Sequence, residues 1–163
     1  MQFWQCFTTR KQQGEWVELQ FMAQAASRRF AVCKPWADMG PYDIGIEYGE
    51  NFLRVQVKGT TQRVGGGYRC QMRPMHRKRH PYSPNQIDLF AAYAIPANAW
   101  YLIPATIILA SGCARDIMIC PITTPKKKAS YRFECYREAW NLLTKTRSDL
   151  ATSNTRDIKG GLE

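Results

Sequence analysis

The sequence predicts an α/β fold in which a mixed central β-sheet is flanked by α-helices. Residues 11–29 have the apolar spacing of an amphipathic helix, and several short runs that follow have the composition of strands. Two of these runs, residues 42–47 and 52–58, are separated by a turn sequence and predict a β-hairpin. The length of 163 residues favours one domain that is large enough to bury a core.

The first helix is predicted over residues 11–29 because apolar side chains recur at the spacing of one helix face. Glu18 lies at the edge of this apolar stripe. A short first strand is expected at residues 30–34 and is ended by Pro35. The stripe itself consists of Trp16, Leu19, Phe21, Met22, Ala23, Ala25 and Ala26.

The hairpin determines which side chains share a face. A two-residue loop at residues 49–50 sets the register, and one face of the hairpin is then entirely apolar. On the other face Asp43 falls opposite Gln56, with Lys58 one step further along. Opposite side chains lie ~5 Å apart at Cβ, which suits joint coordination of a metal ion beside a lysine. The expected apolar pairs are Ile46 with Leu53, Ile44 with Val55 and Tyr42 with Val57.

More strands and a second helix are expected after the hairpin. The glycines at 65–67 predict a turn, since they lack the G-K-[ST] and the following helix of a phosphate loop. Residues 133–143 are amphipathic and predict a helix. From Thr144 onward the chain is polar and aperiodic, so we expect a domain over residues 1–143 and a flexible tail over 144–163. The further strands are expected at residues 68–73, 87–95, 100–103 and 117–120.

The charge balance predicts a polyanionic partner. The chain has 23 Lys and Arg against 13 Asp and Glu, a net charge of +10, and neutralising phosphates releases counterions. A cationic surface without a nucleic-acid partner is the alternative. The residues that we expect to contact the phosphates of a nucleic acid are Arg73, Arg77, Lys78 and Arg79 in a loop bounded by prolines, and Lys126, Lys127 and Lys128 further on. Tyr68, Tyr82 and Tyr131 lie near these charges and are expected either to stack on bases or to pack in the core.

The cysteine pattern and the apolar runs predict a cytoplasmic protein. None of the six cysteines lies in a C-x-x-C pair, and we expect reduced, buried thiols. The first residues lack the pattern of a signal peptide. The most apolar run, residues 100–113, is too short to cross a bilayer and contains Pro104, so no membrane partner is expected.

Two further acids are expected to have structural roles. Glu47 shares the face of Asp43 but lies near Arg54, which favours a cross-strand ion pair over metal binding. Asp88 opens an apolar strand and predicts a structural or subunit contact.

These motifs resemble the PD-(D/E)xK nuclease superfamily, whose shared core has the order α-β-β-β-α-β. Pro41-Tyr42-Asp43 matches the aspartate that begins the second core strand, and Gln56-Val57-Lys58 matches the Glu or Gln and the lysine that end the third. Glu18 matches the carboxylate of the first helix. Residues 87–93 and 100–104 are similar to group I intron-associated endonucleases, a subgroup that also resembles archaeal Holliday-junction resolvases. The resemblance covers residues 11–143.

The resemblance implies a restriction-endonuclease-like fold and a Mg²⁺-dependent DNA endonuclease of homing type. Asp43, Gln56 and Glu18 would hold the Mg²⁺, or Mn²⁺ in its place, and Lys58 would orient water or stabilise charge on the phosphate. The implied partners are double-stranded DNA and further copies of this chain, as a dimer or a tetramer. A structure-specific junction resolvase and a non-catalytic DNA-binding relic remain alternatives, because Gln56 brings no charge where an acid is usual.

Overall fold

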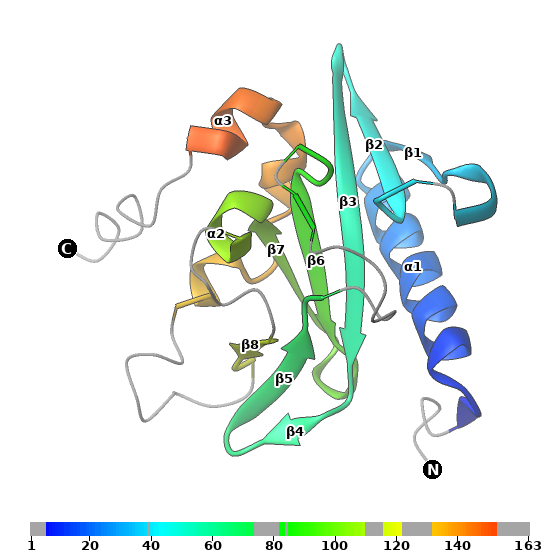
Figure 1. Cartoon of the computed structure of the whole chain (residues 1–163), viewed down its shortest axis with the longest axis vertical. Coiled ribbons are helices and arrows are strands. Elements are labelled where there is room, and N and C mark those ends of the chain that lie inside the picture. The colour runs from blue at the N-terminus through cyan, green and yellow to red at the C-terminus, as the bar shows by residue number, and fades with distance from the viewer. Residues whose placement is uncertain are drawn as a thin grey trace.

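The central element of the computed structural model is a five-stranded mixed sheet (Figure 1). Its strands lie in the order β1 (Ala31–Cys33), β2 (Ile44–Tyr48), β3 (Asn51–Thr60), β6 (Leu89–Ala94) and β7 (Ala99–Pro104). β3 and β6 are parallel, and the other neighbours are antiparallel. The structure describes residues 6–38, 40–73, 82–83, 85–109, 116–121 and 132–152. The predicted α/β class with a mixed sheet and flanking helices is confirmed.

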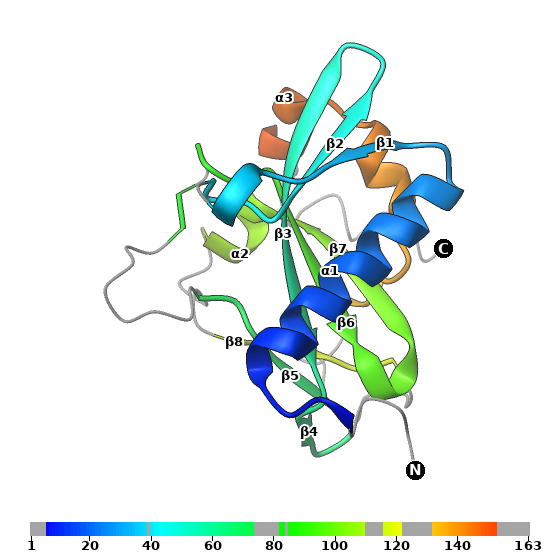
Figure 2. The ribbon, with the colours of Figure 1, turned by 90° about the vertical axis from the view of Figure 1, so that its right-hand side faces the viewer.

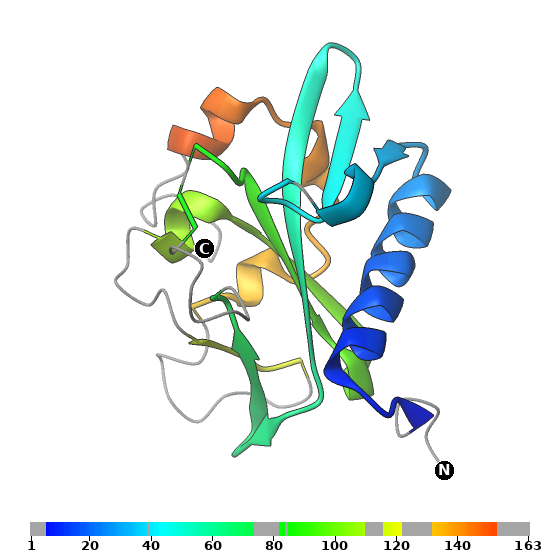
Figure 3. The same cartoon turned by 45° about the vertical axis from the view of Figure 1, so that its right-hand side comes forward.

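A second, smaller sheet lies beside the C-terminal half of β3. It has the order β4 (Arg63–Val64), β5 (Gly67–Gln71) and β8 (Asp116–Ile119). The predicted turn at residues 65–67 is confirmed, and Gly65 adopts a φ of +57° there, which favours glycine. Figure 3 shows β5 on one side of this half of β3 and α1 (Arg10–Ser27) on the other.

The first helix covers the apolar face of the large sheet (Figure 2). Its N-cap is Thr9, whose side chain accepts a hydrogen bond from the Gln12 backbone nitrogen. The buried residues are Val17, Phe21 and Ala25, spaced four apart. The predicted stripe was wrong about Ala23 and Ala26, which are exposed, and about Leu19, which is 60% exposed, and it missed Val17. Trp16 and Met22, which belong to the predicted stripe, are partly buried against the same core cluster.

Close approach of α1 to β3 depends on Gly59. A Cβ at this position would lie 2.6 Å from a methyl carbon of Val17. Glycine therefore lets the helix lie directly over the end of β3, next to Lys58. This packing brings Glu18, the neighbour of Val17, toward the same end of the sheet.

The predicted register of the hairpin is confirmed for the pairs within β2 and β3. The predicted pair of Tyr42 with Val57 is not formed: the Tyr42 ring contacts Phe52 instead, with centroids 6.1 Å apart. Ile46 pairs with Leu53 and Ile44 with Val55, and these side chains belong to the core beneath α1. One further backbone hydrogen bond lies just before β2, where the Asp43 nitrogen donates to the oxygen of Val55, the partner of Ile44, at 3.0 Å. The Asp43 side chain lies on the opposite face, where its carboxylate accepts a hydrogen bond from the Gln56 amide.

The prediction of one helix over residues 133–143 is wrong. The segment forms two short 3₁₀ helices, η5 (Glu134–Tyr136) and η6 (Trp140–Thr144). Between them Arg137 forms a bridge with Tyr101 on β7, and the Glu138 carboxylate accepts from the Trp100 nitrogen at 2.7 Å. These contacts with the sheet edge replace the hydrogen bonds that a continuous helix would need. The remaining short helices are η2 (Trp36–Asp38), η3 (Ile95–Ala97) and α2 (Ala105–Leu109).

The expectation of a flexible tail is wrong for its first residues. They form α3 (Arg147–Thr152), whose Leu150 is 2% exposed in the core. Arg147 donates to Asp88 at 3.0 Å, which ties α3 to the start of β6. Residues 153–163 lie outside the described residues. The polar composition of this segment gave no indication that Leu150 is buried or that Arg147 pairs with Asp88.

Asp88 has the structural role that was predicted, and Arg54 is its main partner. Its carboxylate accepts hydrogen bonds from the Arg54 backbone nitrogen at 2.8 Å and from Nε and Nη2 of the Arg54 guanidinium at 3.0 and 2.9 Å. Burial by itself would raise the pKa of Asp88, but these bonds and the charge of Arg147 lower it. The predicted pair between Glu47 and Arg54 is wrong, because Arg54 is taken by Asp88.

Asp88→Ala should lower the free energy of unfolding by about 3 kcal/mol, because Arg54 would be left partly buried without its partner. Urea denaturation measures this change. Arg147→Ala is the control: this side chain is 55% exposed, so its loss should cost less than about 1 kcal/mol. Equal losses in the two variants would show that Asp88 does not anchor β3 to β6.

Candidate active site

Asp43, Gln56 and Lys58 lie together on the polar face of the hairpin. Asp43 directly precedes β2, while Gln56 and Lys58 alternate along β3 and so point to the same side. The Gln56 amide nitrogen donates to the Asp43 carboxylate, and the Val57 backbone nitrogen donates to the same oxygen at 2.8 Å. The structure thus brings together the acid and the amide that the register placed opposite each other.

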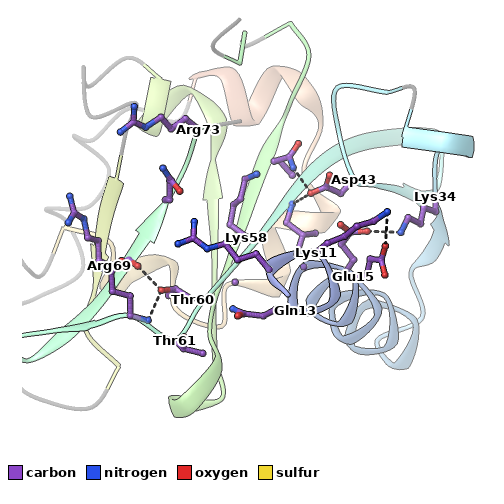
Figure 4. Close-up of a pocket in the computed structure, with 18 residues that line it drawn as sticks. Lys11, Gln13, Glu15, Lys34, Asp43, Lys58, Thr60, Thr61, Arg69 and Arg73 are labelled. Atoms are coloured by element: carbon purple, nitrogen blue, oxygen red, sulfur yellow. Dashed lines mark hydrogen bonds and ion pairs between the residues drawn. The ribbon is translucent and has the colours of Figure 1, made fainter. Parts of the chain in front are cut away.

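Glu18 reaches the same place from the helix. It lines one groove of about 430 Å³ together with Asp43, Gln56 and Lys58 (Figure 4). The Glu18 carboxylate forms an ion pair with the ammonium group of Lys34, at 2.6 Å. Lys34 directly follows β1. All four residues proposed from the sequence for catalysis and metal binding therefore border this groove. They come from α1, from the residue before β2 and from β3.

The groove is strongly basic. Arg10 and Lys11 border it from the start of α1, and Arg69 and Arg73 border it from β5 and the residues just after that strand. Of these only Arg73 was predicted as a DNA contact. Arg69 had no signal in the sequence, since a lone arginine in a short strand does not show which way it faces. The predicted contacts Arg77, Lys78, Arg79, Lys126, Lys127 and Lys128 lie outside the described residues.

The carboxyl group of Asp43 has a raised pKa. Its burial raises its pKa to about 6, and the negative charge of Glu18 raises it as well. The positive charge of Lys58 and the hydrogen bonds from Val57 and Gln56 act in the opposite direction and do not cancel the burial. Burial therefore makes the negative charge of Asp43 costly, and a cation bound beside the carboxylate would stabilise that charge.

The donor set fits a sparse magnesium site. Mg²⁺ prefers oxygen ligands and is usually held by one or two carboxylates, with water completing its coordination. Asp43 and Glu18 supply carboxylates. Gln56 supplies an amide oxygen once its side-chain amide rotates, so that the oxygen and not the nitrogen faces the metal. Among the described residues no group of three or more His, Cys, Asp or Glu side chains could hold a metal. A site with fewer acids plus an amide is thus what this chain offers.

Several other residues have structural roles, among them Asp116, for which the sequence predicted no role. Asp116 pairs with Arg69 at 2.7 Å, which holds one cation of the groove in place. Tyr68 is 3% exposed and belongs to the core, so it is not placed to stack on bases. Tyr131 lies outside the described residues. The prediction of buried thiols is wrong for Cys6, Cys33 and Cys135, which are exposed.

The stability of the metal-free protein should fall as the pH rises through the pKa of Asp43. The folded state keeps this proton up to about pH 6, whereas the unfolded chain loses it near the ordinary value of 3.8. The folded protein binds more protons in this window, so its free energy of unfolding decreases with pH, by up to ~3 kcal/mol at neutral pH. Urea titrations from about pH 4 to pH 7, with EDTA, measure this effect.

Asp43→Asn is the matched control for this pH dependence. Its neutral side chain should make it equal to the wild type at about pH 4 and more stable at neutral pH. A difference between the two proteins that does not change with pH would mean that Asp43 titrates normally.

The fold and the groove define the class of protein, and comparison with known proteins names the family. A mixed sheet with an acid and a lysine on one hairpin, bordered by cations, fits the class of nucleases. The chain belongs to the PD-(D/E)XK endonuclease family, whose model matches residues 8–143. Comparison with curated proteins gives no match.

One similar solved structure is that of a bacterial homing endonuclease, I-Ssp6803I. The two chains superpose with a TM-score of 0.71 at 22% sequence identity, over 91% of this chain and 100% of the other. This likeness shows the restriction-endonuclease-like fold. In the part of the chain that the structure describes, no helix has the length and apolar character needed to cross a membrane.

Proposed function

We propose that this protein is a Mg²⁺-dependent DNA endonuclease that hydrolyses phosphodiester bonds. The observation that carries the proposal is the convergence of Asp43, Gln56, Lys58 and Glu18 on one groove whose border also carries arginines and lysines. Phosphate groups bind to such cations, and the groove places them around the hairpin face. Double-stranded DNA is the proposed substrate.

Each residue of the proposed site has its own role in the cleavage reaction. Asp43, Gln56 and Glu18 hold the metal ion, for which Mn²⁺ can substitute. When bound, the ion polarises the phosphate and acidifies a water molecule. Lys58 orients the attacking water or stabilises the charge that develops on the phosphate oxygens. The cations of the groove, with Arg77 to Arg79 and Lys126 to Lys128, hold the DNA backbone.

We further propose a homing-type endonuclease that works in the cytoplasm as a homo-oligomer. The homing type is supported by the fold shared with I-Ssp6803I and by the resemblance of residues 87–93 and 100–104 to intron-associated enzymes. A symmetric dimer or tetramer would present one groove to each strand of a duplex, which is the simplest way to cut both.

A non-catalytic DNA-binding relic is the second candidate, and one contact favours it. Gln56 donates its amide to Asp43, so the position that usually carries a metal-binding acid stabilises the metal-free carboxylate instead. A protein that had lost its metal would keep such a bond and would keep the basic groove.

Cleavage assays separate these functions. The protein is incubated with plasmid DNA and with a four-way junction, in Mg²⁺ and in EDTA. Plasmid cleavage at defined positions in Mg²⁺ supports the homing type, whereas preferential cutting of the junction supports a resolvase. Tight binding of DNA without Mg²⁺- or Mn²⁺-dependent cutting would support the relic and contradict the nuclease.

A further inference from the structure

Lys58 is held by a tyrosine from a later part of the chain. Its ammonium group donates a hydrogen bond of 3.1 Å to the Tyr82 hydroxyl and lies 5.4 Å from the centre of the Tyr82 ring. A lysine side chain is flexible, and these two contacts fix its end. We propose that Tyr82 is the positioning residue of Lys58, and that it holds the ammonium group ready for the DNA phosphate. The inference rests on the proposed nuclease function.

Tyr82 is itself well anchored. Its ring packs edge-on against Phe90, with centroids 5.6 Å apart at an interplanar angle of 72°. Phe90 is fully buried on β6, where it pairs with Gln56, and the next residue on that face, Ala92, pairs with Lys58. Paired residues of neighbouring strands point to the same side. The small side chain of Ala92 therefore leaves room for the lysine to lie beside the tyrosine.

Asp43 is the competing partner for Lys58. Both residues border the same groove, yet among the described residues no ion pair joins them (Figure 4). A direct pair would occupy the carboxylate proposed to hold the metal and would neutralise the ammonium group that the phosphate needs. The hydrogen bond to Tyr82 thus keeps both charges available for the reaction.

Tyr82→Phe tests this role, because it removes the hydroxyl and keeps the ring against Phe90. We expect kcat for DNA cleavage to fall about 10-fold or more, because a misplaced reacting group is costly, while KM stays nearly constant. Tyr93→Phe is the matched control: the Tyr93 hydroxyl donates to Asn98 at 2.7 Å, and neither residue borders the groove. It loses a comparable hydrogen bond and should leave kcat unchanged. An unchanged kcat in Tyr82→Phe, with cleavage by the wild type, overturns the proposal.

A double-mutant cycle shows whether Tyr82 acts through Lys58. In a Lys58→Ala background, Tyr82→Phe should have no further effect on kcat, whereas additive losses contradict the proposal. A crystal structure of Tyr82→Phe gives a readout that does not need activity. Its Lys58 ammonium group should turn to Asp43, and an unchanged lysine overturns the proposal. This structure also distinguishes the failure of the inference from the failure of the nuclease function, which the wild-type assay reports.

Discussion

Asp43→Ala should reduce Mg²⁺-dependent DNA cleavage by about 1,000-fold or more and leave DNA binding intact. Asp43 is the carboxylate at the centre of the proposed metal site, and a bound metal supplies several kcal/mol of transition-state stabilisation. The groove keeps its cations in the variant, so affinity for duplex DNA in EDTA should change little. Single-turnover cleavage and a binding titration, made on the same preparation, measure the two quantities.

Glu47→Ala is the matched control for this loss. Glu47 is a carboxylate on the same face of the hairpin, but it is exposed and outside the groove. Its removal should leave both cleavage and binding unchanged. Full activity in Asp43→Ala would show that another group holds the metal, and the proposed site would be wrong.

Lys58→Ala should lower kcat by roughly 100- to 1,000-fold, with a small effect on the affinity for DNA. A single preorganised donor at developing negative charge contributes an effect of this size. Lys58 is suited to that role because its hydrogen bond goes to a neutral hydroxyl, so its charge is not consumed by an acid. Steady-state kinetics at saturating Mg²⁺ separate kcat from KM.

Lys11→Ala removes a positive charge from the same groove and serves as the comparison. The Lys11 side chain is 80% exposed at the start of α1 and lies 3.8 Å from the Glu15 carboxylate. Its loss should raise KM a few-fold and leave kcat unchanged. If Lys58→Ala behaved in the same way, Lys58 would be a DNA contact and not a catalytic group.

The hairpin and its register could be predicted because all of the information was local. The turn residues and the alternation of side chains fix which residues pair, and a shift by one position would have put Asp43 in the core. The same alternation placed Gln56 and Lys58 on one face, as the structure has them. The contribution of Glu18 needed the family resemblance, because nothing local says where a helix lies on a sheet.

The remaining features depend on contacts between distant parts of the chain. Arg69 enters the groove only because a second sheet forms beside β3. Tyr82 meets Lys58 because β6 returns parallel to β3, a pairing that needs a long connection. Residues 133–143 have a helical pattern, but their bonds to β7 override it. Local sequence patterns do not show which distant residues will be in contact.

The most direct test of the proposed site is a crystal of the protein with duplex DNA and Mn²⁺, in which anomalous scattering locates the metal. The proposed site requires an anomalous peak within about 2 Å of oxygens of Asp43 and the Gln56 amide, between the hairpin face and a DNA phosphate. Lys58 should lie against the same phosphate. A peak at other residues, with Asp43 still hydrogen bonded to the Gln56 amide nitrogen in the presence of cut DNA, would contradict it.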